Sequence, residues 1–421
     1  MNKTYYPVKT QYVRVGMWIN GLLHIPETAE EEKSLAVLCM HSDADYFTFP
    51  AGRALASHGY RTFCANVSRE QMPLDRKLDD VKQCIEYLKT LPGVEKVVVL
   101  GHSGGATLMS CYQAVAENGA AYFQGEEKIV PLSDVGPLPA ADGVMIIDSN
   151  WGNGTMTLLS LDPAVKEEGN GVDLDPEYDL GSEANGYKPG GACYSEDFVK
   201  KYLYAQHKRN NCLIDAALER LEAIKSGKGS YRDDEPWIIV GGAQMAPNNR
   251  LFPQDIRYLS HTKGEWPLIH ADGSITVGVI PSLRKPRGAK SFTGVYGMGT
   301  GVFSVKQYLA SNCVRTTEDF GYDETHVYGV DWDSSYCCTP GNVKGIHNPM
   351  LIMGMTGGYE FLAAECIYEN AAAEDKTLAF VEGASHMLTP AKDCEEYPGQ
   401  FGDTVKNLFD FAADWLEKRF A

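Results

Sequence analysis

A strand, a sharp turn and a helix follow one another within residues 97–116. Residues 97–100 (VVVL) form an uninterrupted apolar run, residues 101–105 (GHSGG) contain three glycines, and residues 106–116 have a helical pattern. A strand that is apolar on both faces needs another layer on each side, as in the parallel sheets of α/β proteins. The segment therefore predicts the α/β fold class for the chain around it.

Alternating strands and helices extend from this segment over both outer parts of the chain. A hairpin is expected at residues 8–25, and apolar residues spaced four, three, four and three apart predict a helix at 74–88. Other strands are expected at 35–40, 60–67, 141–148, 349–353 and 377–381, and other helices at 51–57 and 405–421. This order predicts a mostly parallel sheet with helices on both faces.

Residues 151–345 break this pattern. Their composition turns to Gly, Pro, Asn and Asp, with separate helices expected at 198–203 and 213–224 and a hairpin turn at Asp272-Gly273. The segment is too long for a loop and too irregular to continue the sheet. We therefore expect a large mixed α+β cap, inserted after the strand that ends near Asp148. The expected domains are a discontinuous core, residues 1–150 and 346–421, and a cap or lid, residues 151–345.

The turn after the third buried strand has the pattern G-x-S-x-G, with Ser103 at its centre. A serine hydroxyl is a weak nucleophile until a base removes its proton, and it must stand clear of the backbone to reach a carbonyl carbon. A tight strand-to-helix turn exposes the hydroxyl in this way, and glycines on both sides permit the turn. Ser103 is therefore the candidate nucleophile.

Four segments of the outer parts resemble those of the α/β-hydrolase superfamily. In chain order they are Met40-His41-Ser42-Asp43, the GHSGG turn, the late strand NPMLIMG and Val381-Glu-Gly-Ala-Ser-His386. The resemblance covers about half of the chain and implies an α/β-hydrolase fold with a Ser-His-acid triad. It also disfavours epoxide opening and halide displacement, because relatives with those activities use Asp in place of the serine.

The resemblance implies His386 as the base, since it lies in the loop after a late strand and follows the nucleophile in chain order. The acid leaves alternatives open. No aspartate stands shortly after Gly354, where the family commonly has one, and we favour Glu360 as the nearest carboxylate. Asp148 is the second choice, because some relatives carry the acid after this strand. The third alternative is that neither serves and Glu360 is a solvated loop residue.

Two backbone amides are expected to stabilise an oxyanion. One belongs to Gly104, directly after the nucleophile, and the other to Ser42 or Asp43 in the loop after the first buried strand. His41 is expected in this oxyanion loop, where the shape of the backbone matters more than the imidazole. His102 is expected to line the pocket or to pack locally.

Aromatic residues are common in the expected cap. Most of them are expected to form the core of the cap itself. Trp151 and Tyr336 are candidates for a roof over Ser103, because a cap in this fold lies above the nucleophile. Such a roof would favour a bulky, partly apolar acyl or alcohol group.

The chain is acidic, with 38 Lys and Arg against 56 Asp and Glu and a formal net charge of −18 over 421 residues. Because phosphate groups repel such a surface, we expect neither a nucleic-acid nor a membrane partner. No apolar run approaches ~20 residues, no secretory leader is visible and the cysteines lack CxxC spacing, which predicts a soluble cytoplasmic protein. Neither a metal nor a cofactor is expected, because no ligand spacing for one is visible.

These features predict a serine hydrolase that cleaves a carboxylic ester, thioester or lactone of a small to medium, partly apolar molecule through an acyl-enzyme. An acyltransferase or a C–C bond hydrolase would use the same triad. From another class, a ligand-binding protein with a disabled triad remains an alternative, because the usual aspartate is missing. The sequence leaves the substrate and the oligomeric state open.

Overall fold

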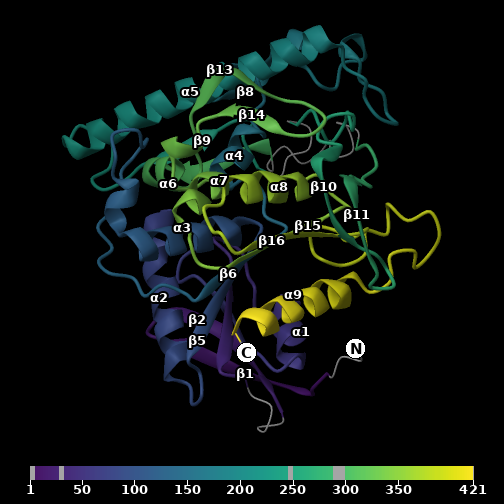
Figure 1. Cartoon of the computed structure of the whole chain (residues 1–421). Helices are drawn as coiled ribbons and strands as arrows, with labels where there is room; N and C mark the ends of the chain where they lie inside the picture. The colour runs from purple at the N-terminus through teal and green to yellow at the C-terminus, as the bar shows by residue number, and fades with distance from the viewer. Residues whose placement is uncertain (1–4, 28–32, 245–249, 288–298, 421) are drawn as a thin grey trace.

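The computed structural model describes residues 5–27, 33–244, 250–287 and 299–420. Ten strands of this part form the central sheet, in the order β1-β2-β4-β3-β5-β6-β15-β16-β10-β11 (Figure 1). The strands are β1 (Val8–Val15), β2 (Ile19–Pro26), β3 (Leu35–Met40), β4 (Arg61–Asn66), β5 (Lys96–His102), β6 (Gly143–Ile147), β10 (His261–Ile269), β11 (Ile275–Pro281), β15 (Met350–Met355) and β16 (Lys376–Val381). From β4 to β10 neighbouring strands are parallel, while β1, β2 and β11 pair antiparallel at the two edges.

The strand side chains alternate between two apolar clusters, one on each face of the sheet. In β5, Val97 and Val99 belong to the cluster under α2 (Leu74–Thr90), α3 (Gly104–Asn118) and α8 (Phe361–Asn370). Val98 and Leu100 belong to the cluster under α1 (Ala51–Ser57) and α9 (Thr404–Phe420). The expected mostly parallel sheet with helices on both faces is therefore confirmed.

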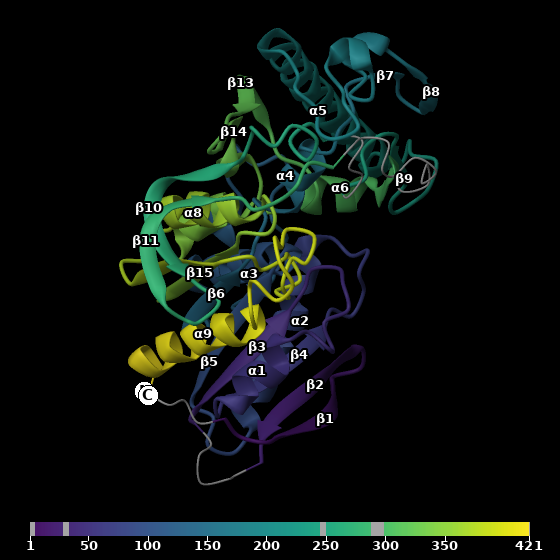
Figure 2. The same ribbon diagram turned by 90° about the vertical axis from the view of Figure 1, so that its right-hand side faces the viewer.

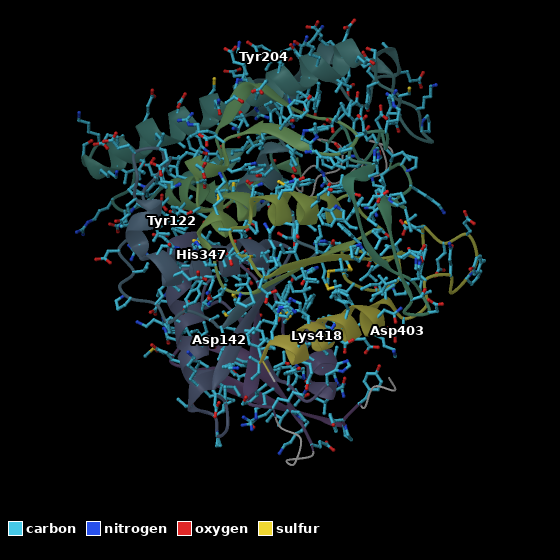
Figure 3. The ribbon with its side chains drawn as sticks, viewed as in Figure 1. Tyr122, Asp142, Tyr204, His347, Asp403 and Lys418 are labelled. Carbon is cyan, nitrogen blue, oxygen red and sulfur yellow. The ribbon has the colours of Figure 1, made fainter. Side chains whose placement is uncertain are left out.

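Most of the inserted segment gathers at the end of the molecule away from both termini, at the top of Figure 1. Its elements are α4 (Asn153–Leu158), β7 (Val165–Glu167), β8 (Asn170–Leu174), α5 (Glu196–Lys225), β9 (Pro236–Ile239), β12 (Gly301–Ser304), α6 (Val305–Ser311), β13 (Thr316–Tyr322), β14 (Val327–Val330) and α7 (Thr339–Asn342). Figure 3 places Tyr204 on the outward side of α5, where it is exposed. Within the described ranges, no helix is both long and apolar enough to cross a membrane.

The two helices expected at 198–203 and 213–224 are one continuous helix, α5, of 30 residues. The polar stretch between them stays helical because its buried side chains find partners on neighbouring segments. Gln206 donates to the carbonyl of Leu161 at 2.9 Å, and Asn210 donates to the carbonyl of Val314 at 2.9 Å. Periodicity of apolar residues alone does not reveal this.

The hairpin expected around Asp272-Gly273 is present, but its place in the fold differs from the expectation. His270 N donates to Ser274 O at 2.9 Å across the turn that joins β10 to β11. β10 pairs in parallel with β16, so the hairpin extends the central sheet beyond β16 and lies beside α8 (Figure 2). The interpretation that nothing in residues 151–345 continues the sheet is therefore wrong for this hairpin.

Candidate active site

Ser103 stands at the turn between β5 and α3. Its φ of 53° and ψ of −129° lie in a region that residues with a side chain rarely occupy. A Cβ atom on Gly101 would lie 2.5 Å from Gly105 O, and one on Gly105 would collide with Met40 O. The glycines thus allow the strand, the turn and the start of α3 to pack closely and hold the serine in this strained conformation.

His386 connects Ser103 to Asp148. Its Nε2 atom lies 2.9 Å from Ser103 Oγ, and its Nδ1 atom lies 2.7 Å from Asp148 Oδ2. The other oxygen of Asp148 accepts a hydrogen bond from Met355 N at 2.8 Å, and this carboxylate is buried. A hydroxyl, an imidazole and a carboxylate are therefore joined in one hydrogen-bonded chain, which is the arrangement that serine nucleophiles require.

The three side chains follow β5, β6 and β16, whose carboxyl ends meet at one edge of the parallel sheet. Three features decide the architecture. They are two antiparallel strands at one edge, the strand order β2-β4-β3-β5-β6-β15-β16, and a serine on the strained turn after β5. The chain has the α/β-hydrolase fold. The resemblance seen in the sequence is thus confirmed at the level of the fold.

Comparisons with known proteins find structural relatives of low sequence identity. The sequence matches no model of a protein family and no curated protein. A hypothetical protein from Pseudomonas aeruginosa is 12% identical, with 98% of this chain and 94% of that chain covered and a TM-score of 0.45. A monoglyceride lipase from Saccharomyces cerevisiae is 12% identical, with 100% of this chain and 98% of that chain covered and a TM-score of 0.43. Brefeldin A esterase, a bacterial homologue of human hormone-sensitive lipase, is 12% identical, with 99% of this chain and 79% of that chain covered and a TM-score of 0.42.

The structure brings Asp148 to His386 and leaves the favoured carboxylate, Glu360, outside the hydrogen-bonded chain. Glu360 directly precedes α8, and its Oε2 atom accepts a hydrogen bond from Tyr359 N at 3.2 Å. Asp148 reaches the imidazole because β6 lies beside β5, and because a φ of 41° turns the residue at the end of its strand. The sequence preference between the two carboxylates is therefore reversed.

The pKa values of Asp148 and His386 are both raised, by burial in one case and by neighbouring negative charges in the other. Burial raises the pKa of Asp148 to about 6, against the hydrogen bond from His386, which lowers it. Burial by itself lowers the pKa of His386, but the bond to Asp148 and the charges of Glu360 and Asp148 outweigh it and raise that pKa from 6.5 to about 9. Glu360 thus acts on the imidazole through its charge without touching it.

The expected oxyanion loop lies against the start of α3. A Cβ atom on Gly104 would lie 2.6 Å from Ser42 Oγ, so the two expected amide donors belong to segments in close contact. The amide of Asp43 donates a hydrogen bond to His41 Nδ1 at 3.1 Å. The amide of Ser42 has no hydrogen-bond acceptor within the described part of the chain.

Lys77, on α2, holds the oxyanion loop from behind. Its ammonium group donates to Ser42 O and to Glu70 O, each at 2.6 Å. The side chain is buried, and burial lowers its pKa to about 8. Sequence reasoning missed this residue, because a lysine beside the apolar stripe of a helix resembles any solvent-facing lysine.

His102 supports His386 rather than lining a pocket. Its Nε2–H donates to the backbone carbonyl of His386 at 2.6 Å, and its Nδ1 is hydrogen-bonded to Tyr46 Oη. The ring is buried, which holds its pKa well below the usual range. His102, Asp148 and His386 lie close enough together to hold a metal ion, but all four ring nitrogens already have hydrogen-bond partners.

Trp151 and Tyr336 do not form the expected roof. Their exposed fractions are 0% and 2%, and both belong to the large apolar cluster on the α3 side of the sheet. A side chain with no accessible surface cannot contact a substrate. These aromatic residues therefore stabilise the junction between the sheet and the inserted segment.

Proposed function

We propose that the protein is a serine hydrolase that cleaves a carboxylic ester through Ser103, His386 and Asp148. The observation that carries this proposal is the hydrogen-bonded chain from Ser103 Oγ through the imidazole to a buried carboxylate. The strained turn that presents the hydroxyl supports it. The close packing of Ser42 and Met40 against Gly104 and Gly105 at the start of α3 supports the assignment of the amides of Gly104 and Ser42 as oxyanion donors.

The proposed reaction has two stages. His386 Nε2 takes the proton of Ser103 Oγ while the oxygen attacks the ester carbonyl, and the amides of Gly104 and Ser42 stabilise the oxyanion. The imidazolium then gives this proton to the departing alcohol, which leaves an acyl-serine. A water molecule, deprotonated by the same nitrogen, releases the acid and restores the serine.

Asp148 would orient the imidazole and stabilise its positive charge throughout. This role weakens the alternative of a ligand-binding protein with a disabled triad, because that alternative rested on the lack of an acid. Acyl transfer and C–C bond hydrolysis would use the same three side chains. We further propose that the inserted segment, residues 151–345 apart from the β10–β11 hairpin, acts as a cap over this site.

Labelling with an active-site fluorophosphonate tests the proposed nucleophile. We expect the wild-type protein to be phosphonylated at Ser103, as located by mass spectrometry of the peptide that contains it. Ser103→Ala should not be labelled, and His386→Ala should be labelled far more slowly, because the hydroxyl keeps its proton. Absence of labelling in a folded wild-type protein would contradict the proposal.

The pH dependence of ester hydrolysis should reflect the raised pKa of His386. Only the neutral imidazole accepts a proton, so kcat/KM should rise with pH up to about 9 rather than level off near 6.5. In Glu360→Gln the loss of a negative charge makes the imidazolium less favourable. The pKa of His386 then falls, and the rising limb of kcat/KM should move to lower pH.

Glu369→Gln is the matched control for this measurement, because Glu369 is an exposed carboxylate on α8. Its profile of kcat/KM against pH should coincide with that of the wild type. Identical profiles for Glu360→Gln and the wild type would show that the charge of Glu360 does not act on His386.

A further inference from the structure

A cavity of about 230 Å³ opens directly beside His386. Its walls come from the loop that follows β15, the loop that carries His386, and two segments of the insertion, around Arg250 and after β11. The cavity therefore lies at the same edge of the sheet as the triad. His386 is one of the residues that line it, so a molecule that fills the cavity lies next to the base of the proposed mechanism.

The walls of this cavity are unusually basic for an acidic chain. Four cationic side chains line it, Arg250, Arg284, Lys285 and Arg287, against two carboxylates, Glu360 and Asp393. Arg287 and Asp393 are exposed and lie 3.8 Å apart, so they balance each other. The remaining part of the lining carries three positive charges and one negative charge, in a chain whose net charge is −18.

Arg250 is the cation that lacks a counterion most clearly. Its side chain is 5% exposed, and its guanidinium lies over the rings of Phe252 and Tyr359, 5.9 and 5.4 Å from their centres. One terminal nitrogen donates to Tyr359 Oη, and Nε is buried with no hydrogen-bond partner in the described part of the chain. None of the ion pairs of the described residues includes Arg250, although an unpaired buried charge is costly.

Arg284 lies in the same wall and is held by neutral groups. Its terminal nitrogens donate to the carbonyls of Leu259 and Tyr258, each at 2.5 Å. Its Nε is buried and has no hydrogen-bond partner among the residues that the structure describes. Burial lowers its pKa to about 10, so it stays charged at neutral pH. Carbonyl dipoles stabilise this charge without neutralising it, and Glu360 is the carboxylate of the lining whose charge acts on it, so the lining keeps more positive than negative groups.

We propose that the cavity binds a carboxylate on the substrate, so that the preferred ester carries an anionic group a few bonds from the scissile carbonyl. The inference rests on the proposed ester hydrolysis and adds its substrate class. A guanidinium matches the planar geometry of a carboxylate. A singly charged carboxylate is favoured over a doubly charged phosphate because Glu360 lines the same cavity. An apolar acyl group would leave Arg250 buried with no carboxylate partner among the described residues.

Matched pairs of 4-nitrophenyl esters test this inference. The mono-4-nitrophenyl ester of glutaric acid carries a free carboxylate, and the corresponding methyl glutarate ester has the same chain without the charge. We expect kcat/KM to be about 10- to 100-fold higher for the acid, because hydrogen bonds to a charged group contribute this much. A phosphonate analogue of the same chain length should be a poorer substrate than the carboxylate.

Arg250→Gln should reduce the ratio of the two kcat/KM values by at least about tenfold. The control is Arg53→Gln, since Arg53 is an exposed arginine on α1, and its ratio should equal that of the wild type. If Arg250→Gln does not fold, the wild type provides the readout. Glutarate monomethyl ester should then protect Ser103 from the fluorophosphonate, and the uncharged dimethyl ester should not.

The outcomes separate the two proposals. Hydrolysis of both esters at equal rates, together with labelling of Ser103, would overturn the carboxylate site and leave the ester hydrolase standing. A preference for the phosphonate would show that the cavity selects a phosphate-like dianion and would also overturn the inference. Failure of labelling and of all hydrolysis would refute the proposed function, and the inference with it.

Discussion

Asp148→Asn is expected to lower kcat for ester hydrolysis by about 10³- to 10⁴-fold. The amide can still accept from Met355 N, and Asn tolerates a positive φ, so the fold should be preserved. Its NH₂ group, however, would donate to His386 Nδ1. The proton of the imidazole would then sit on Nε2, which could no longer accept the proton of Ser103. Steady-state kinetics with a 4-nitrophenyl ester measure the effect.

Glu360→Gln is the comparison that gives this result its meaning. Glu360 lies outside the hydrogen-bonded chain, so kcat at the optimal pH of each variant should stay within about tenfold of the wild type. If Glu360→Gln lost most of its kcat while Asp148→Asn kept the kcat of the wild type, the acid would be Glu360, as the sequence analysis favours. Circular dichroism of both variants controls for the fold.

The spacing of residues in the sequence does not show which of the two carboxylates, Asp148 or Glu360, is hydrogen-bonded to His386. Both Asp148 and Glu360 follow core strands, β6 and β15, and these strands are neighbours in the sheet. Either residue is therefore at the correct edge. The decision depends on the positive φ of Asp148 and on the amide of Met355, which holds one carboxylate oxygen while the other faces His386. Such orientations follow from packing across strands that are distant in sequence.

Local signals, in contrast, were sufficient for most of the core. The sequence predicts the buried strand, the GHSGG turn and the following helix, because the residues of each are those that its local backbone geometry requires. The sequence does not predict that β10 pairs with β16, because pairing between strands that are distant in the chain has no local sequence pattern. Isolated basic residues such as Lys77, Arg250 and Arg284 gave no signal, because only burial distinguishes them from surface residues.

Gly105→Ala should damage both stability and activity, because the turn depends on a close approach between α3 and the end of β3. An added Cβ atom would collide with Met40 O and lie 3.2 Å from His41 Cα, and both partners are backbone atoms that cannot rotate away. We expect the free energy of unfolding to fall by about 2–3 kcal/mol, the cost of overpacking in a dense core. Urea denaturation measures this change.

The same collision pushes the oxyanion loop away from Ser103, so activity should fall further than stability alone explains. A displacement of 1 Å costs about 100-fold in kcat/KM, and this loss should persist at temperatures where Gly105→Ala is fully folded. Gly278→Ala is the matched control, because a Cβ atom there, on β11, meets no atom of the described residues within 4 Å. If Gly105→Ala behaved like Gly278→Ala in both measurements, the close packing of α3 against the expected oxyanion loop would not be what positions Ser103.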